Sequence, residues 1–141
     1  MRLAQQRESC NRAEAAEIAL DLLGFRTERE ISWILSKHFL LAGKIKACER
    51  ACDTEELYKK LGKWRDSESY SPLTGDLVIH VGVYEDGSFE GDKLSSGFVY
   101  ANDGRKLTVI GTDRSGTVTF YSLGFGEGRI KGYCCPLYEQ Q

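Results

Sequence analysis

The sequence predicts a single α+β domain in which N-terminal helices pack on a five-stranded antiparallel sheet. Apolar residues recur at helical spacing through about residues 9–64. Between about residues 75 and 136, β-branched and aromatic segments instead alternate with turn dipeptides. Helices grouped before strands are typical of this fold class. The chain has 141 residues, which suits one domain with its own core.

The first helix is expected from Cys10 to Leu23, with Ser9 as its N-cap and Gly24 as its stop. Four residues at steps of three and four form its apolar stripe, and four more widen the stripe. The first four are Ala13, Ala16, Leu20 and Leu23, and the others are Ala15, Ile18, Ala19 and Leu22.

Two further helices are expected before the sheet. Thr27 followed by Glu30 predicts a capping box that opens the second helix, which should end at Gly43. Asp53 with Glu56 predicts another capping box, which opens the third helix, and that helix should end near Gly62.

Five strands are expected in the second half. They cover residues 77–84, 97–101, 107–110, 117–123 and 129–134. The dipeptides at 86–87, 103–104 and 115–116 read as turns, and Asp103-Gly104 is the strongest hairpin signal. The simplest arrangement of these strands is a meander.

Composition limits the classes of function. A net charge of −2 and a pI near 5.7 disfavour nucleic acid as a partner. The sequence has no apolar run long enough to span a bilayer, and its first residues lack the apolar region of a secretory signal. We therefore expect a protein made in the cytoplasm without a signal peptide and without a membrane partner.

Five cysteines cannot all pair within one chain, so at least one thiol is free or pairs between chains. Structural or incidental roles are expected for Cys48, Cys52, Cys134 and Cys135, because two adjacent cysteines are poor ligands for one tetrahedral zinc. No metal and no cofactor is predicted.

Cys10, His80 and Asp113 are the candidate catalytic residues. A thiol on the first turn of a helix is more easily ionised, because the helix dipole stabilises its anion. His80 lies in an otherwise apolar strand, where a rigid imidazole base is expected. Asp113 follows a later strand and supplies a carboxylate to orient that imidazole. Taken singly, each residue is more often structural, as core cysteine, core histidine and turn aspartate.

Three segments carry a resemblance to a known family. They are Ser9-Cys10-Asn11-Arg12, residues 74–84 (TGDLVIHVGVY), and residues 109–121 with 132–136. Together they resemble papain-like amidases and endopeptidases of the NlpC and CHAP type, which cut amide links in bacterial cell walls. The resemblance implies a papain-like fold and a cysteine hydrolase with Cys10 as nucleophile, His80 as base and Asp113 as its orienting group.

The same resemblance implies a peptidoglycan peptide as substrate. Without an export signal, such an enzyme needs another route to the wall, as an injected antibacterial effector or a phage lysis enzyme. An injected toxin would have an immunity protein that blocks its site. Two alternatives stay open: a cysteine protease or deamidase toxin acting on a protein, and a non-catalytic α+β binding module in which Cys10 and His80 are core residues.

Overall fold

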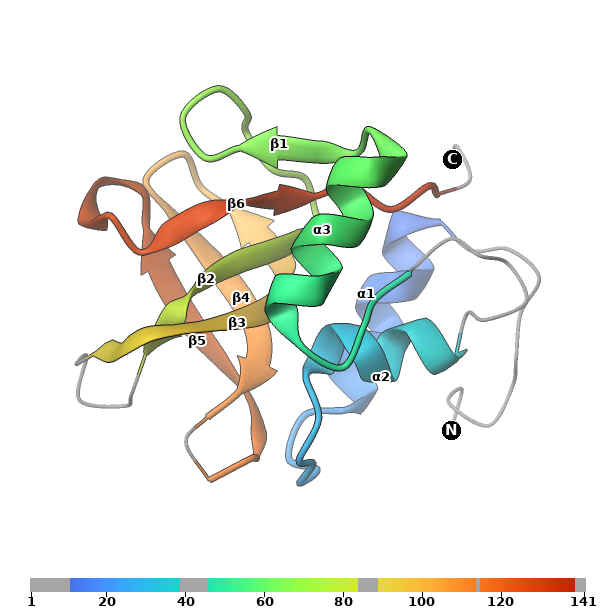
Figure 1. Cartoon of the computed structure of the whole chain (residues 1–141). Helices are drawn as coiled ribbons and strands as arrows, with labels where there is room; N and C mark the ends of the chain where they lie inside the picture. The colour runs from blue at the N-terminus through green and yellow to red at the C-terminus, as the bar shows by residue number, and fades with distance from the viewer. Residues whose placement is uncertain (1–10, 39–45, 84–88, 114, 139–141) are drawn as a thin grey trace.

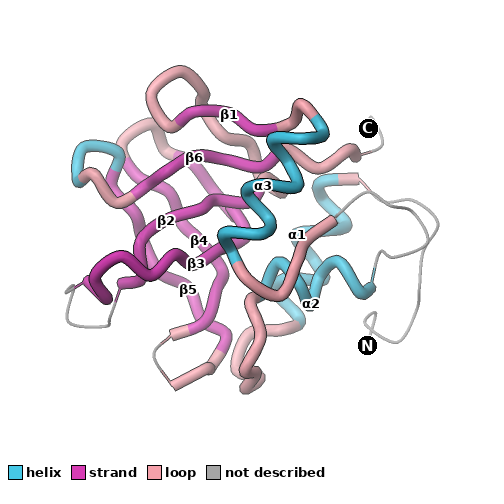
Figure 2. Tube along the Cα trace, viewed as in Figure 1, coloured by secondary structure: helices cyan, strands magenta, loops and turns pink. Residues whose placement is uncertain are grey.

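The computed structural model describes residues 11–38, 46–83, 89–113 and 115–138, which form an α+β fold. The three helices gather on one side of the sheet (Figures 1 and 2). The helices are α1 (Arg12–Asp21), α2 (Ile31–His38) and α3 (Ala51–Leu61). The strands are β1 (Trp64–Asp66), β2 (Leu77–Val83), β3 (Phe89–Asn102), β4 (Lys106–Thr112), β5 (Val118–Gly124) and β6 (Ile130–Cys134), and a short 3₁₀ turn, η2 (Phe125–Glu127), joins the last two.

The described strands form one antiparallel sheet with six strands in the order β1-β6-β2-β3-β4-β5. The meander is confirmed from β2 to β5, but the expectation of five strands in a simple meander is wrong. β6 returns to pair with β2, and the unexpected β1 pairs with β6. β1 has only three residues, so it is too short to show a strand pattern in the sequence.

β3 begins at Phe89, well before the predicted start at Gly97. Its first part reads Glu-Gly-Asp-Lys, which has low strand propensity. Pairing with β2 explains the extension, because Val83 lies opposite Phe89 and Leu77 opposite Phe98. Tertiary pairing therefore overrides local preference in this segment.

α1 begins at Arg12 with Asn11 as its N-cap, so the predicted start at Cys10 with a Ser9 cap is corrected. The Asn11 side chain accepts from the N–H of Glu14, and the Glu14 carboxylate accepts from the N–H of Asn11. This reciprocal pair satisfies two donors that the helix start otherwise leaves unbonded. Gly24 has a φ of 90° after the helix, which confirms it as part of the stop.

The starts of the other two helices also differ from the prediction. The Thr27 hydroxyl accepts from the N–H of Arg29, and the Glu30 carboxylate accepts from the N–H of Ser96, so they form no capping box. α3 starts at Ala51, before Asp53, and its N-cap Arg50 makes no side-chain cap. Gly62 ends α3 in the left-handed conformation, as expected. The predicted end of the second helix lies outside the described residues.

Two apolar clusters cover the two faces of the sheet. The helix-side cluster includes Leu77, Ile79, Phe98 and Ile110, which pack against the helices. The far-side cluster is Val78, Val99, Leu107, Val109, Leu123 and Tyr133. In α1 the buried residues are Ala15, Ile18 and Ala19, and Leu22 at its C-cap is also buried, whereas Ala13, placed in the predicted stripe, is exposed. The residues predicted to widen the stripe are therefore the fully buried ones, and Ala16, Leu20 and Leu23 of the stripe itself are partly buried against the same cluster.

Candidate functional site

His80 lies on the far side of the sheet from the helices. Side chains alternate along a strand, so His80 shares its face with Val78, while Leu77 and Ile79 point to the helix-side cluster. The residue is buried, with 2% of its surface exposed.

Both ring nitrogens of His80 are hydrogen-bonded. Nδ1 lies 2.6 Å from the carbonyl oxygen of Val81, and Nε2 lies 2.6 Å from the hydroxyl oxygen of Tyr121. A carbonyl oxygen only accepts, so Nδ1 carries the proton and donates to it. In the neutral ring Nε2 is then the acceptor, and the Tyr121 hydroxyl donates to it.

Tyr121 reaches His80 from β5 by crossing over β4 and β3. Two glycines leave room for its ring on these strands. A Cβ added at Gly111 would lie 2.7 Å from Tyr121 Cε1, and one added at Gly97 would lie 2.8 Å from its hydroxyl oxygen. Both separations are too short for real contacts, so this path requires glycine at both positions. The two aromatic rings then meet edge to face, with centroids 5.4 Å apart.

Burial lowers the pKa of His80 to about 4, and the hydrogen bond to Val81 only partly opposes this. His80 is therefore neutral at pH 7. A cysteine hydrolase of the expected kind needs an imidazole that takes a thiol proton and holds the thiolate as an ion pair. In this structure neither ring nitrogen of His80 is free to take a thiol proton, and burial disfavours the charged ring.

Asp113 lies just after β4, in the turn that leads to β5. Its Oδ1 accepts from the N–H and the hydroxyl of Ser115 and from the N–H of Thr117. These contacts are typical of a carboxylate that organises a turn. Because Val81 and Tyr121 already occupy both nitrogens of His80, the ring is oriented by Tyr121 and a backbone carbonyl, not by Asp113.

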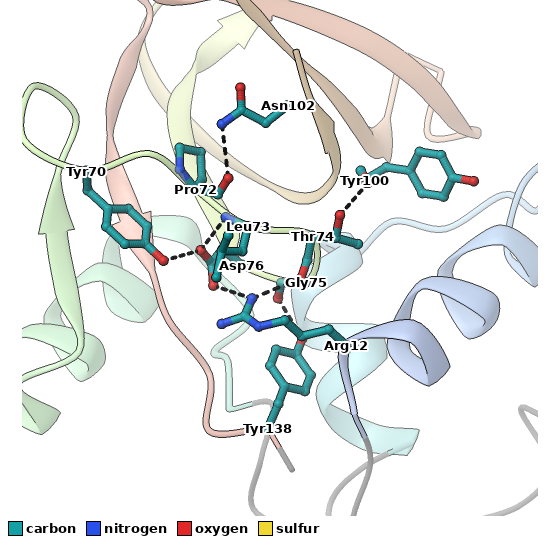
Figure 3. A network of polar contacts seen from close by, with 10 residues as sticks. All are labelled: Arg12, Tyr70, Pro72, Leu73, Thr74, Gly75, Asp76, Tyr100, Asn102 and Tyr138. Carbon is teal, nitrogen blue, oxygen red and sulfur yellow. Dashed lines mark hydrogen bonds and ion pairs between the residues drawn. The ribbon is translucent and has the colours of Figure 1, made fainter. Parts of the chain in front are cut away.

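Cys10 lies outside the described residues, so its pairing with His80 stays a prediction. The start of α1 two residues later is fixed, however. Nη1 of Arg12 donates to Oδ1 of Asp76 at 2.8 Å and to the carbonyl oxygen of Thr74 at 2.9 Å (Figure 3). These contacts hold the start of α1 against the chain that enters β2.

Asp76 is fully buried and is the centre of this network. Its Oδ2 accepts from the Tyr70 hydroxyl at 2.6 Å and from the N–H of Leu73 at 2.9 Å. The Arg12 guanidinium lies 4.9 Å from the ring centroid of Tyr138, whose hydroxyl donates to the carbonyl oxygen of Gly75. We call Arg12, Tyr70, Asp76 and Tyr138 the Asp76 network.

The Asp76 network and His80 lie at different points along the chain, because Asp76 immediately precedes β2 and His80 lies within it. Asp76 and His80 are four residues apart, which is about 13 Å along an extended strand. Arg12 belongs to α1, whose buried residues pack in the helix-side cluster, whereas His80 shares its face of the sheet with Val78 of the far-side cluster.

Sequence reasoning missed Tyr121, Tyr70 and the Arg12–Asp76 pair as site residues. One signal for Tyr121 was present, since isolated glycines at 97 and 111 within strands indicate close approach of another group. The partners of Asp76 come from segments distant in sequence, and no local pattern indicates them.

The described cysteines do not form an activated thiol site. Burial raises the pKa of the Cys134 thiol, and burial also raises that of Cys135. Cys52 is exposed, and Cys48 is half-buried. Among the described residues, no three His, Cys, Asp or Glu side chains lie close enough together to hold a metal ion.

The helices in the described ranges include none that is both long and apolar enough to cross a membrane.

No protein-family model and no curated protein matches the chain. Among solved structures, the fold is similar to the crystal structure of Ly7917, with a TM-score of 0.57 and 16% sequence identity. The alignment covers 89% of this chain and 62% of the Ly7917 chain, so the present chain spans less than two thirds of that protein. At this identity the likeness concerns the fold alone.

Proposed function

We propose that this chain is a non-catalytic α+β binding module whose ligand is a peptidoglycan peptide. The assignment as non-catalytic rests on His80, which is buried and has both ring nitrogens hydrogen-bonded. This is the arrangement of a core histidine, and it agrees with the structural interpretation of that residue in the sequence.

The choice of ligand rests on the resemblance of three short segments to cell-wall amidases and endopeptidases. Binding and chemistry use different groups, so a surface that binds the peptide does not require an available base. Binding without cleavage is the expected behaviour of such a module.

Co-sedimentation with purified peptidoglycan tests the proposal. We expect the chain to sediment with the wall while releasing no soluble peptides, and Cys10→Ala and His80→Gln to bind as well as the unchanged chain. Release of peptides that both substitutions abolish, but that Cys52→Ala leaves intact, would overturn the non-catalytic assignment. Failure to sediment would overturn the choice of ligand.

A second candidate is the cysteine hydrolase itself, with Cys10, His80 and Asp113 as its residues. One observation favours it: Arg12 and Asp76, which belong to two of the three resembling segments, are joined by an ion pair at the start of α1. In this case His80 must first release Nε2 from Tyr121. The peptidoglycan peptide is then a substrate, and an immunity protein is the expected inhibitor of a delivered toxin.

Thiol reactivity separates the two candidates. A hydrolase requires Cys10 to be alkylated at pH 6 much faster than the exposed Cys52, because only an activated thiol is ionised at that pH. The binding-module proposal predicts no such advantage for Cys10. Mass spectrometry of the alkylated peptides measures both rates in the same sample.

A further inference from the structure

We propose that Arg12 binds a carboxylate group of the ligand through the edge of its guanidinium formed by Nε and Nη2. This inference rests on the proposed peptide-binding function and names the part of the ligand that the chain recognises. The site is the half-exposed end of the Asp76 network.

The hydrogen bonds of Arg12 are unevenly distributed. Nη1 makes both of its described polar contacts, to Asp76 and to the Thr74 carbonyl. Nε and Nη2 have no hydrogen-bond partner among the described residues, and Figure 3 shows no dashed line from them. These two atoms form the side-on edge that binds a carboxylate with two parallel hydrogen bonds.

The guanidinium is held in place before any ligand arrives. Asp76 and Thr74 fix Nη1, and the ring of Tyr138 supports one flat face at 4.9 Å. Asp76 is fixed in turn by the Tyr70 hydroxyl and the N–H of Leu73. A preorganised arginine loses less side-chain entropy on binding than a free one, so each new hydrogen bond contributes more to affinity.

Exposure and charge both allow an anion to reach this edge. The Arg12 side chain is 29% exposed, while its partner Asp76 has no exposed side-chain surface. Both oxygens of Asp76 accept hydrogen bonds, which disperses its negative charge. Burial opposes the charged form of Arg12, but the hydrogen bond and charge of Asp76 outweigh it and raise the pKa, so the guanidinium stays charged.

A carboxylate suits this edge better than a neutral group. An amide presents one acceptor oxygen beside a donor NH₂, so it cannot accept both hydrogen bonds from Nε and Nη2. A chain-terminal or side-chain carboxylate of a short peptide accepts both. The structure therefore favours a peptide with a free carboxylate over the same peptide with that group amidated.

NMR titration with two small probes tests the inference. The probes are N-acetyl-alanyl-alanine and its C-terminal amide, and the readout is the Nε–H resonance of Arg12 in the unchanged chain. We expect a saturable shift with the acid and none with the amide. The control is Arg65, an exposed arginine whose Nη1 also makes two hydrogen bonds, in its case to the backbone carbonyls of Gly62 and Trp64. No shift at Arg12, the same shift with the amide, or an equal shift at Arg65 would each overturn the inference.

A variant adds a second, independent measurement. Arg12→Lys keeps the charge but loses the planar edge, so we expect about tenfold or greater weakening of binding to the acid probe, with Arg65→Lys unchanged. Equal affinities of Arg12→Lys and the unchanged chain would contradict the role of the edge. Circular dichroism confirms that the variant is folded, and the titration of the unchanged chain decides the question if it is not.

The outcomes separate this inference from the proposed function. If the chain sediments with peptidoglycan but the Arg12 Nε–H resonance does not shift with the acid probe, the carboxylate site is overturned and the binding function still stands. A response of Arg12 to the acid probe without sedimentation overturns peptidoglycan as the ligand and leaves the site standing.

Discussion

Replacing Tyr121 with Phe isolates the hydrogen bond on which the state of His80 depends. Phe keeps the ring that passes over Gly97 and Gly111, and it removes only the hydroxyl that donates to His80 Nε2 at 2.6 Å. His80 is 2% exposed, so Nε2 is left as a buried acceptor without a donor. Such a loss costs about 1–3 kcal/mol of unfolding free energy.

Tyr133 provides the matched control for this change. It is fully buried like His80, but its hydroxyl has no hydrogen-bond partner among the described residues. Tyr133→Phe therefore removes a buried hydroxyl that makes no hydrogen bond there. We expect the unfolding free energy of this variant to fall by less than about 0.5 kcal/mol or to rise.

Urea unfolding followed by circular dichroism measures both variants. The expected pattern is a lower midpoint for Tyr121→Phe with an unchanged slope, and an unchanged or higher midpoint for Tyr133→Phe. Equal unfolding free energies for the two variants would refute the reasoning, because they would show that the Tyr121 hydroxyl contributes no more than an unpaired one.

Asp76→Asn should lower the unfolding free energy by about 2–4 kcal/mol, because it leaves the Arg12 charge unpaired. Asp53→Asn, in the exposed pair with Arg50, should lower it by less than about 1 kcal/mol. Comparable urea midpoints for the two variants would contradict this expectation. The folded pKa of His80 lies near 4, below its unfolded value of about 6.5, so the unfolded chain binds a proton that the native chain does not. Stability should then fall between about pH 6.5 and pH 4 by up to ~3 kcal/mol, and His80→Gln should remove that part of the fall; a His80→Gln variant with the full fall would show that other groups cause it. Under native conditions iodoacetamide should modify the exposed Cys52 first and the buried Cys134 last among the described cysteines, as mass spectrometry can follow; early modification of Cys134 would contradict its burial and raised pKa.

The parts of the fold that local signals determine were predictable from the sequence. The meander from β2 to β5 follows from strand patterns separated by turn dipeptides, and Gly104 in the Asp103-Gly104 turn has the positive φ that such a turn requires. The stops at Gly24 and Gly62 follow from the same conformational freedom of glycine.

The predicted start of α1 is wrong because the signal at Asn11 was not used. Ser9 and Asn11 are both good N-cap residues, but only Asn11 has a Glu three positions later to complete a capping box. Glu14 was therefore the deciding residue. The three-residue β1 and the return of β6 to β2 depend on tertiary pairing, which no local pattern encodes.

The candidate site was less predictable because its contacts span the sheet. The motif around His80 indicates a rigid imidazole, and the structure holds it rigidly, but through Tyr121 on β5, three strands away in the sheet order. Asp113 taken singly is more often a turn residue than a catalytic carboxylate, and its described contacts are those of a turn. The role of Cys10 stays a prediction.

The protonation state of His80 decides whether its imidazole is a structural or a catalytic group. Nitrogen NMR of labelled protein between pH 5 and 8 distinguishes the two neutral tautomers from the charged ring. We expect a neutral ring protonated on Nδ1 throughout this range, identical in the unchanged chain and in Cys10→Ala. A charged ring at pH 7 that becomes neutral in Cys10→Ala would contradict the account, since it would reveal a thiolate–imidazolium pair.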